Sequence, residues 1–219
     1  SGRLMPLVEE NRLFGKIGDF INRRFPGRPQ RGGPPFGEMM NVLEQFQLLP
    51  AIFFLKSRAE CDAALETCGP RADETADGTF PEELEECLDR FPYLRNHRQL
   101  RDLRIARVAA HHGGQLPAWK FLVETTMKQG HLRAIFATST VAAGVNFPAR
   151  TIVLMNSDLF NGHEFSPLSG TEFHQMTGRA GRRGQDRVGF MLTVPGRFMD
   201  LIHIRKLLLK KPEAITSRI

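Results

Sequence analysis

The run AIFFL, residues 51–55, decides how the rest of the chain is interpreted. It is short and apolar at every position, which is typical of a strand buried on both faces, as in a parallel sheet. Four further short runs follow it: RVAAHH (107–112), LRAIFAT (132–138), RTIVLMN (150–156) and VGFMLTV (188–194). The chain therefore contains five candidate strands of one sheet.

Segments with helical spacing alternate with these runs. Ser57 is placed to cap a helix that ends near Thr67, and residues 116–129 carry a one-sided apolar stripe before Gly130. Alternating strands and helices predict an α/β fold, a parallel sheet covered by helices on both faces. Ligands of such folds bind at the loops beyond the carboxyl ends of the strands.

Composition limits the class of protein. With 219 residues, 41% of them hydrophobic, the chain can bury the core of one large domain or two small ones. No secretory leader and no membrane-spanning run is visible, so we expect a cytoplasmic protein that has no membrane partner. The three cysteines lack the spacing of a disulfide framework or a zinc site, so no metal is predicted.

Charge and composition also divide the chain. Residues 22–37 are a Pro/Gly/Arg tract that cannot pack a core, so we predict an arm and linker over 1–37 and a folded domain over 38–219. Nine acidic residues and two arginines fall within 66–90, which indicates an acidic helical insert at about 66–104. The remainder is strongly basic. A basic remainder suits a polyanion, although it also fits a plain cationic domain.

Two loops hold residues suited to phosphate. In HHGGQLP (111–117), two glycines permit close backbone approach and a helix then begins, although a plain tight turn is the alternative. In ATSTVAAGVNFPAR (137–150), hydroxyl side chains that include Thr138 and Thr140 stand at a helix start. Hydroxyl and N–H groups there could hold a second phosphate.

The stretch FHQMTGRAGRRGQDR (173–187) combines arginines, glycines and a glutamine. If it is helical, Arg179 and Arg182 project from one face, with Gln175 one turn earlier on the same side. The glycines beside them would let a charged ligand approach, and paired guanidinium groups suit a transferring phosphoryl group. A basic helix end that complements its own dipole would explain one or two arginines, but not the glutamine and the glycines.

These motifs resemble those of superfamily 2 helicases. QMTGRAGRRG resembles motif VI, ATSTVAAGVNFPAR motif V, HHGG the motif IVa turn and AIFFLKSRAECD motif IV, all in the family's order. NGHEFSPLSGTEF, before motif VI, is similar to the DExH-box branch of exosome-assisting RNA helicases and an archaeal repair DNA helicase. The resemblance implies the second, C-terminal RecA-like lobe of such a helicase.

The resemblance also implies roles for individual residues. Arg179 and Arg182 would be arginine fingers, with Gln175 orienting the same region, and Gly144 and Asn146 would line the nucleotide. The residues implied to contact the nucleic-acid backbone are Ser57, Arg58, His112, Gly113, Gly114, Thr138 and Thr140.

ATP and Mg²⁺ are the cofactors that the family implies, bound between two lobes. This sequence contains no G-x-x-x-x-G-K-[ST] loop, and DETA (73–76) lies in the acidic insert instead of ending a buried strand. We therefore expect the first RecA-like lobe of the same polypeptide and single-stranded or partly duplex nucleic acid as partners, and no ATP hydrolysis by these residues alone. The alternative is a stand-alone nucleic-acid-binding module without ATPase activity.

Residues 157–169 are longer than an ordinary connection requires. Within them, DLFNGHEF places Asn161-Gly162, a favoured two-residue turn, between segments that carry Phe160 and Phe165. In the branch that the chain resembles, a hairpin at this position separates duplex strands, so we expect both phenylalanines to contact nucleic acid. A surface hairpin whose rings only pack on the domain is the alternative.

Overall fold

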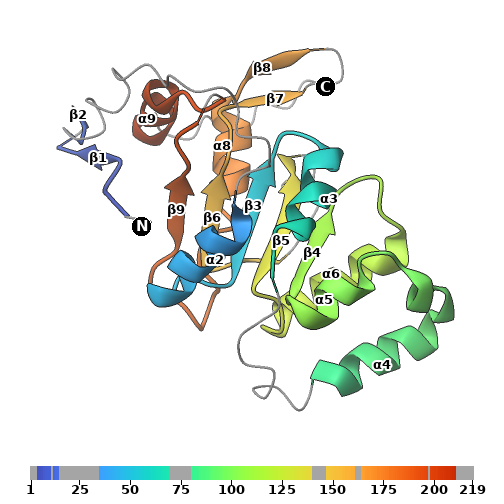
Figure 1. Cartoon of the computed structure of the whole chain (residues 1–219). Helices are drawn as coiled ribbons and strands as arrows, with labels where there is room; N and C mark the ends of the chain where they lie inside the picture. The colour runs from blue at the N-terminus through green and yellow to red at the C-terminus, as the bar shows by residue number, and fades with distance from the viewer. Residues whose placement is uncertain are drawn as a thin grey trace, which may run out of the picture.

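A five-stranded parallel sheet forms the centre of the computed structural model, which describes residues 4–10, 12–14, 35–69, 80–139, 147–160, 164–196 and 198–210 (Figure 1). The strand order is β4-β5-β3-β6-β9. The strands are β3 (Ala51–Leu55), β4 (Val108–His111), β5 (Ala134–Thr138), β6 (Thr151–Leu154) and β9 (Phe190–Thr193). These are the five predicted runs, and each bound lies within two residues of the expected one.

Strand β3 lies in the middle of the sheet and is buried along its whole length. Ala51, Phe53 and Leu55 belong to one hydrophobic core, whereas Ile52 and Phe54 belong to a second core. Because successive side chains of a strand point to opposite faces, a strand between two cores must be apolar at every position. This is the physical reason for the AIFFL run.

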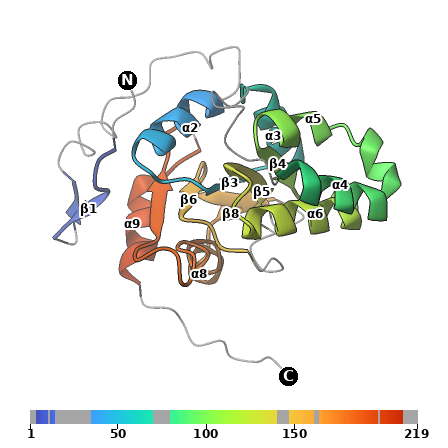
Figure 2. The ribbon, with the colours of Figure 1, turned by 90° about the horizontal axis from the view of Figure 1, so that it is seen from below.

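Helices cover both faces of the sheet, as predicted (Figure 2). One core contains residues of α2 (Phe36–Gln45) and α3 (Arg58–Glu66), and the other contains residues of α6 (Pro117–Lys128), α8 (Gly170–Thr177) and α9 (Leu201–Leu209). The α/β fold class is therefore confirmed.

The region predicted as an acidic insert contains α4 (Phe80–Arg90), the short 3-10 helix η1 (Pro92–Asn96) and α5 (Leu100–Ile105). Their leucines join the core that α6 also enters. The acidic charges of α4 are partly matched from within the insert, because Arg95 lies 2.7 Å from Glu85 and 2.6 Å from Asp89. The domain boundaries themselves stay predictions.

Two short antiparallel ladders complete the described part. One pairs β1 (Val8–Glu9) with β2 (Arg12–Leu13), and the other pairs β7 (Asp158–Phe160) with β8 (Phe165–Pro167). Among the described helices, none is long and apolar enough to cross a bilayer.

Candidate functional site

The carboxyl ends of β3, β4 and β5 lie side by side, because these strands are parallel neighbours in the sheet (Figure 1). Ser57 follows β3, His112 follows β4, and Thr138 is the last residue of β5. The fold thus gathers at one edge six of the seven residues implied to contact a nucleic-acid backbone, and the seventh, Thr140, lies outside the described residues. We call this edge the carboxyl-edge surface, made of Ser57, Arg58, His112, Gly113, Gly114 and Thr138.

Ser57 forms the N-cap of α3, as predicted. Its backbone is extended and its hydroxyl accepts a hydrogen bond from the backbone N–H of Glu60 at 3.1 Å. The hydroxyl oxygen therefore caps the helix while its hydrogen can still donate, and the first turn of α3 starts at the carboxyl-edge surface. A helix start is suited to an anion.

Arg58 is exposed and extends over the two glycines that follow β4. A Cβ built on Gly113 would lie 3.3 Å from Arg58 Nη2, and one built on Gly114 would lie 3.5 Å from Arg58 Cδ. Both glycines are exposed. A guanidinium group and an accessible backbone therefore share one position on the surface.

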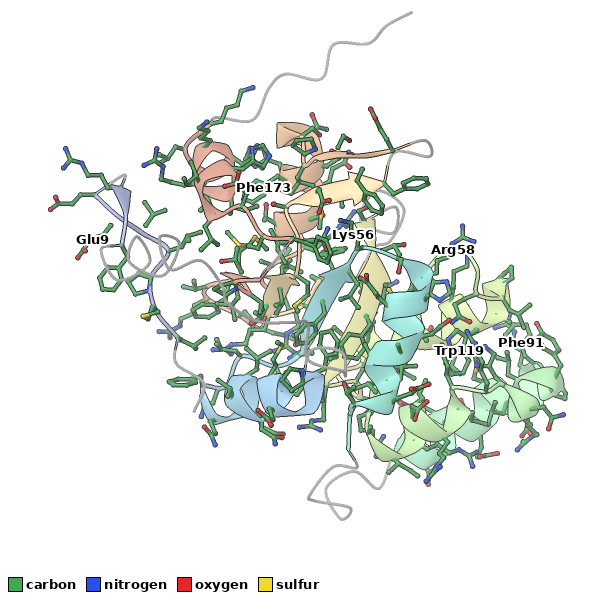
Figure 3. All side chains as sticks on the ribbon, turned by 45° about the horizontal axis from the view of Figure 1, so that its top comes forward. Glu9, Lys56, Arg58, Phe91, Trp119 and Phe173 are labelled. Carbon is green, nitrogen blue, oxygen red and sulfur yellow. The ribbon has the colours of Figure 1, made fainter. Side chains whose placement is uncertain are left out.

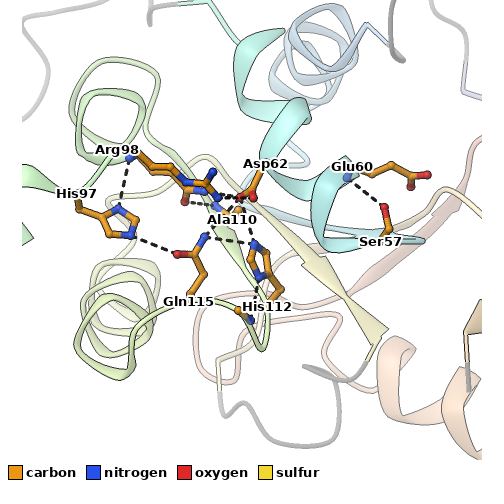
Figure 4. Close-up of polar contacts among 10 residues, drawn as sticks. Ser57, Glu60, Asp62, His97, Arg98, Ala110, His112 and Gln115 are labelled. Carbon is orange, nitrogen blue, oxygen red and sulfur yellow. Dashed lines mark hydrogen bonds and ion pairs between the residues drawn. The ribbon is translucent and has the colours of Figure 1, made fainter. Parts of the chain in front are cut away.

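His112 lies beneath this position, with only 3% of its surface exposed. Its Nδ1 accepts a hydrogen bond from the backbone N–H of Gly114 at 3.1 Å, so Nε2 carries the hydrogen and donates to Asp62 Oδ1 at 3.1 Å (Figure 4). The His112 side chain points into the interior of the domain. In this structure His112 fixes the shape of the glycine turn instead of presenting its ring to a ligand.

Asp62 connects the glycine turn to the insert. Its carboxylate also accepts a hydrogen bond from Gln99 at 2.6 Å and pairs with Arg98 (Figure 4). His97 stacks on Trp119 with ring centres 3.7 Å apart, and burial lowers the pKa of its imidazole. The sequence analysis missed Asp62; the only signal was its place one helical turn after Arg58, on the same face of α3.

The hairpin between β6 and α8 lies at the same end of the sheet (Figure 1). Phe160 pairs with Phe165 in the register of the hairpin. The predicted two-residue turn at Asn161-Gly162 lies outside the described residues and stays a prediction. The two phenylalanine rings are 5.3 Å apart and each is 49% exposed, so both present an aromatic surface to solvent.

The remaining implied residues lie at the end of β5 and after it. Thr138 is the last residue of the strand and is half-buried. Thr140, Gly144 and Asn146 lie outside the described residues, so their roles stay predictions. The described residues resume at Phe147, and Ala149 forms a β-bridge with Ala180.

The arginine-rich stretch is not helical as far as predicted. Helix α8 contains Gln175 and ends at Thr177, with Gly178 as its C-cap, so Arg179 and Arg182 follow the helix. The argument that the three side chains share one helical face is therefore wrong. The loop crosses to the amino ends of the strands, because Ala180 pairs with Ala149, just before β6. We call residues 178–189 the motif VI loop.

Arg182 is held by a carboxylate within this loop. Its Nε and Nη2 lie 2.8 Å and 3.1 Å from Asp186, whose side chain is only 1% exposed and also accepts from Arg150 at 3.3 Å. Hydrogen bonds from Arg182 are the main cause that lowers the pKa of Asp186. The sequence analysis assigned no role to Asp186, although its i, i+4 spacing from Arg182 was visible.

The glycines of the motif VI loop have a structural reason of their own. Gly181 has a φ of +88°, and a Cβ on Gly189 would lie 2.4 Å from the backbone carbonyl of Ala180. Two backbone segments pack directly against each other here, which only glycine allows. Ligand access is therefore not needed to explain these glycines.

A separate apolar hollow of about 480 Å³ lies between α2 and β9, beside residues 4–7. Its lining is largely aliphatic, including Met39, Val42 and Leu192, and none of the implied site residues line it. It lacks the charged groups that a phosphate ligand requires, so we place the functional site at the two loop regions.

Comparisons with known proteins agree with the family that the motifs resemble. A family profile described as "Helicase conserved C-terminal domain" matches residues 83–184. The probable helicase HelY of Mycobacterium tuberculosis is 39% identical over 181 residues, which cover 78% of this chain and 20% of HelY. This chain belongs to the DExH-box helicases. Its sheet and motifs are those of the C-terminal RecA-like lobe, which we call the helicase lobe.

The names of two further relatives include the term RNA helicase, and one of them also names the DExH-box branch. The "DExH-box ATP-dependent RNA helicase DExH15 chloroplastic" of Arabidopsis thaliana is 36% identical over 75% of the chain and 14% of its own length. "Exosome RNA helicase MTR4" of Homo sapiens is 31% identical over 71% of the chain and 16% of its own length. The helicase lobe spans about a fifth or less of the length of these relatives.

Proposed function

We propose that the helicase lobe contributes arginine side chains to an ATP site completed by another RecA-like lobe, and that it holds a nucleic-acid backbone on its carboxyl-edge surface. The observation that carries the proposal is the arrangement of two cationic loops at opposite ends of one sheet. Arg58 lies at the carboxyl end, and the motif VI loop crosses the amino end beside Ala149. One ligand cannot cover both, so two ligands are expected.

The motif VI loop fits a phosphate ligand in charge and geometry. Asp186 engages Nε and Nη2 of Arg182, which leaves Nη1 on the other side of the planar guanidinium group. An arginine whose orientation is already fixed loses little conformational entropy when it binds phosphate. Bound ATP and Mg²⁺ would supply the phosphoryl group and the metal that neutralises it. Gly144 and Asn146 stay predicted neighbours of the nucleotide.

The carboxyl-edge surface fits a nucleic-acid backbone. Arg58 offers a guanidinium group, Gly113 and Gly114 offer accessible backbone, and α3 begins there. Contacts of this kind position a strand without reading its sequence. Two relatives are named as RNA helicases, which supports RNA as the first substrate to test.

The β7–β8 hairpin fits a role in separating paired strands. Phe160 and Phe165 present half-exposed rings beside the surface that would hold the single strand. Stacking of an aromatic ring on a base contributes about 1–3 kcal/mol, which offsets part of the cost of opening a base pair. Packing of the rings on the lobe alone is the simpler alternative, and Phe165 does contact Lys56.

A second function remains open because the carboxyl-edge surface is built from one chain. The helicase lobe could bind a single strand without taking part in ATP hydrolysis. The motif VI loop separates the two functions, since a simple binding module has no need of Arg179 and Arg182.

The test is made in the parent enzyme that contains both lobes. Arg179→Ala and Arg182→Ala should each lower the rate of ATP hydrolysis by about a thousandfold, because an arginine finger stabilises transition-state charge. Single-strand affinity should change less than about twofold. The exposed neighbour variant Arg183→Ala is the matched control, and thermal unfolding of each variant checks the Arg182–Asp186 pair. Normal hydrolysis by both variants would leave the binding module as the better account.

A further inference from the structure

Three segments of the chain meet around the side chain of Lys56, directly after β3. Its Nζ lies 2.6 Å from Asp158 Oδ2, 4.0 Å from the ring centre of Phe165 and 4.1 Å from that of Phe198. The side chain is 12% exposed, and it lies beside the hairpin (Figure 3). We propose that Lys56 is a positioning residue that fixes the orientation of the β7–β8 hairpin for strand separation; this inference rests on the proposed function.

The contacts of Lys56 reach both strands of the hairpin. Asp158 is the first residue of β7, and Phe165 is the first residue of β8. An ammonium group near a carboxylate and over aromatic rings is attracted to all of them, and the attraction strengthens as water is excluded. Because one cation contacts both strands, it restrains the tilt of the hairpin as well as its distance from the sheet.

The third contact, Phe198, is itself fixed to the base of the hairpin. Its carbonyl accepts hydrogen bonds from the backbone N–H of Ser157 at 2.9 Å and from the Ser157 hydroxyl at 3.3 Å. That hydroxyl in turn accepts from the backbone N–H of Asp200 at 2.8 Å. Lys56 therefore packs against a ring whose backbone is hydrogen-bonded to the base of the hairpin.

The hairpin needs such support because it is small. Each strand has three residues, and an isolated two-stranded hairpin is marginal in water. Leu159 is buried and anchors one point, and Leu168 is buried where β8 leaves the hairpin. Those apolar anchors hold the base. Lys56 supplies the polar restraint near the aromatic rings.

Lys56 also joins the hairpin to the carboxyl-edge surface. It directly precedes Ser57 and Arg58, and its backbone N–H donates to Glu60 at 3.1 Å. The turn that presents the backbone contacts therefore also carries the residue that orients the hairpin. A single strand on Arg58 and a duplex end at Phe160 would be held at a fixed separation.

The test uses the parent enzyme with Lys56→Met, which keeps the length of the side chain and removes its charge. Duplex separation should fall about tenfold, whereas single-strand-stimulated ATP hydrolysis should stay within about twofold. Lys56→Arg should restore most of the separation activity, because guanidinium also binds carboxylate and aromatic rings. Lys128→Met, an exposed lysine on α6, is the matched control.

Orientation is measured directly with a Phe160→Trp reporter, whose fluorescence anisotropy should fall when Lys56→Met is added. Equal loss of ATP hydrolysis and separation, or unchanged anisotropy, would overturn the positioning role. A variant with residues 161–165 replaced by a Gly/Ser loop separates the two proposals. If this replacement abolishes separation and Lys56→Met does not reduce it, only the inference about Lys56 fails. If the replacement separates duplexes normally, the strand-separating role of the hairpin fails first.

Discussion

The glycine turn after β4 and the motif VI loop both contain closely spaced glycines, but for opposite reasons. A Cβ on Gly113 would approach only side-chain atoms of Arg58, and the turn is exposed. A Cβ on Gly189 would collide with the backbone of Ala180. An added Cβ in the first turn would meet only side-chain atoms of Arg58 and His112, whereas on Gly189 it would collide with the backbone of the chain itself. Glycine spacing in a sequence does not distinguish these two uses.

The two loops also differ in how they hold their arginines. Arg58 is exposed at the end of the sheet where β3 and β4 finish. Arg182 is bound by a carboxylate that is almost completely buried. One cation is therefore presented by an open turn and the other by a tightly packed loop. Variants in each loop should separate effects on binding from effects on folding.

The largest expected effect is on folding, from Gly189→Ala. The added methyl group cannot avoid backbone atoms 2.4 Å away, so we expect a loss of about 3 kcal/mol or more in the free energy of unfolding. Chemical denaturation of the chain measures it. Gly170→Ala, where nothing lies within 4 Å, is the control and should change stability by less than about 0.5 kcal/mol. Equal stability of the two variants would contradict the close packing.

A smaller effect, with a defined pH dependence, is expected from Asp186→Asn. Its folded pKa is lowered by Arg182, so its stabilising effect is complete above the unfolded value of about 3.9 and is lost as the pH falls through the folded value. We expect a loss of about 1.5–3 kcal/mol at pH 7 that shrinks below pH 4. Urea denaturation at pH 7 and at pH 3 measures this loss in the free energy of unfolding.

Asp89→Asn is the matched control for this experiment, because Asp89 also pairs with an arginine but is 76% exposed. Exposed pairs contribute little, so its effect should be under about 1 kcal/mol at either pH. A loss from Asp186→Asn that is the same at pH 7 and pH 3 would show that the carboxylate charge is not what holds the motif VI loop.

The smallest expected effect is on binding, from Arg58→Ala. Loss of one phosphate contact should lower single-strand affinity about threefold to tenfold and reduce the slope of log affinity against log salt by about one. Fluorescence anisotropy with an RNA oligonucleotide at several salt concentrations measures both. Arg183→Ala, in the motif VI loop, should leave the slope unchanged. If it changes the slope as much as Arg58→Ala, the two loops do not have separate ligands.

The framework of the fold was predictable because its causes are local in sequence. Strands buried on both faces must be apolar throughout, so AIFFL and its four companions were visible, and Ser57 carried an N-cap signal. The extent of α8 was not predicted correctly. The sequence analysis placed Gln175, Arg179 and Arg182 on one helix, but Gly178 ends α8 and the backbone turns at Gly181.

Within the candidate site, the motifs indicated which loops matter but not what each side chain does. His112 is buried and donates a hydrogen bond to Asp62, which is distant in sequence. Asp186 holds Arg182, and Lys56 contacts a hairpin that follows it by about a hundred residues. Such partners depend on tertiary packing, which neither periodicity nor motif spacing reports.

The position of β3 at the centre of the sheet has a consequence for how the lobe folds. Ala51 pairs with Ala134 on one side and with Thr151 on the other, so the middle strand emerges from the ribosome long before either neighbour. Pairings between distant segments close large loops and are slow to form. Until residues 134–154 have been synthesised, AIFFL is an unpaired apolar segment that is prone to aggregation. We therefore expect the yield of the folded lobe to depend on chaperones that cover this segment during synthesis.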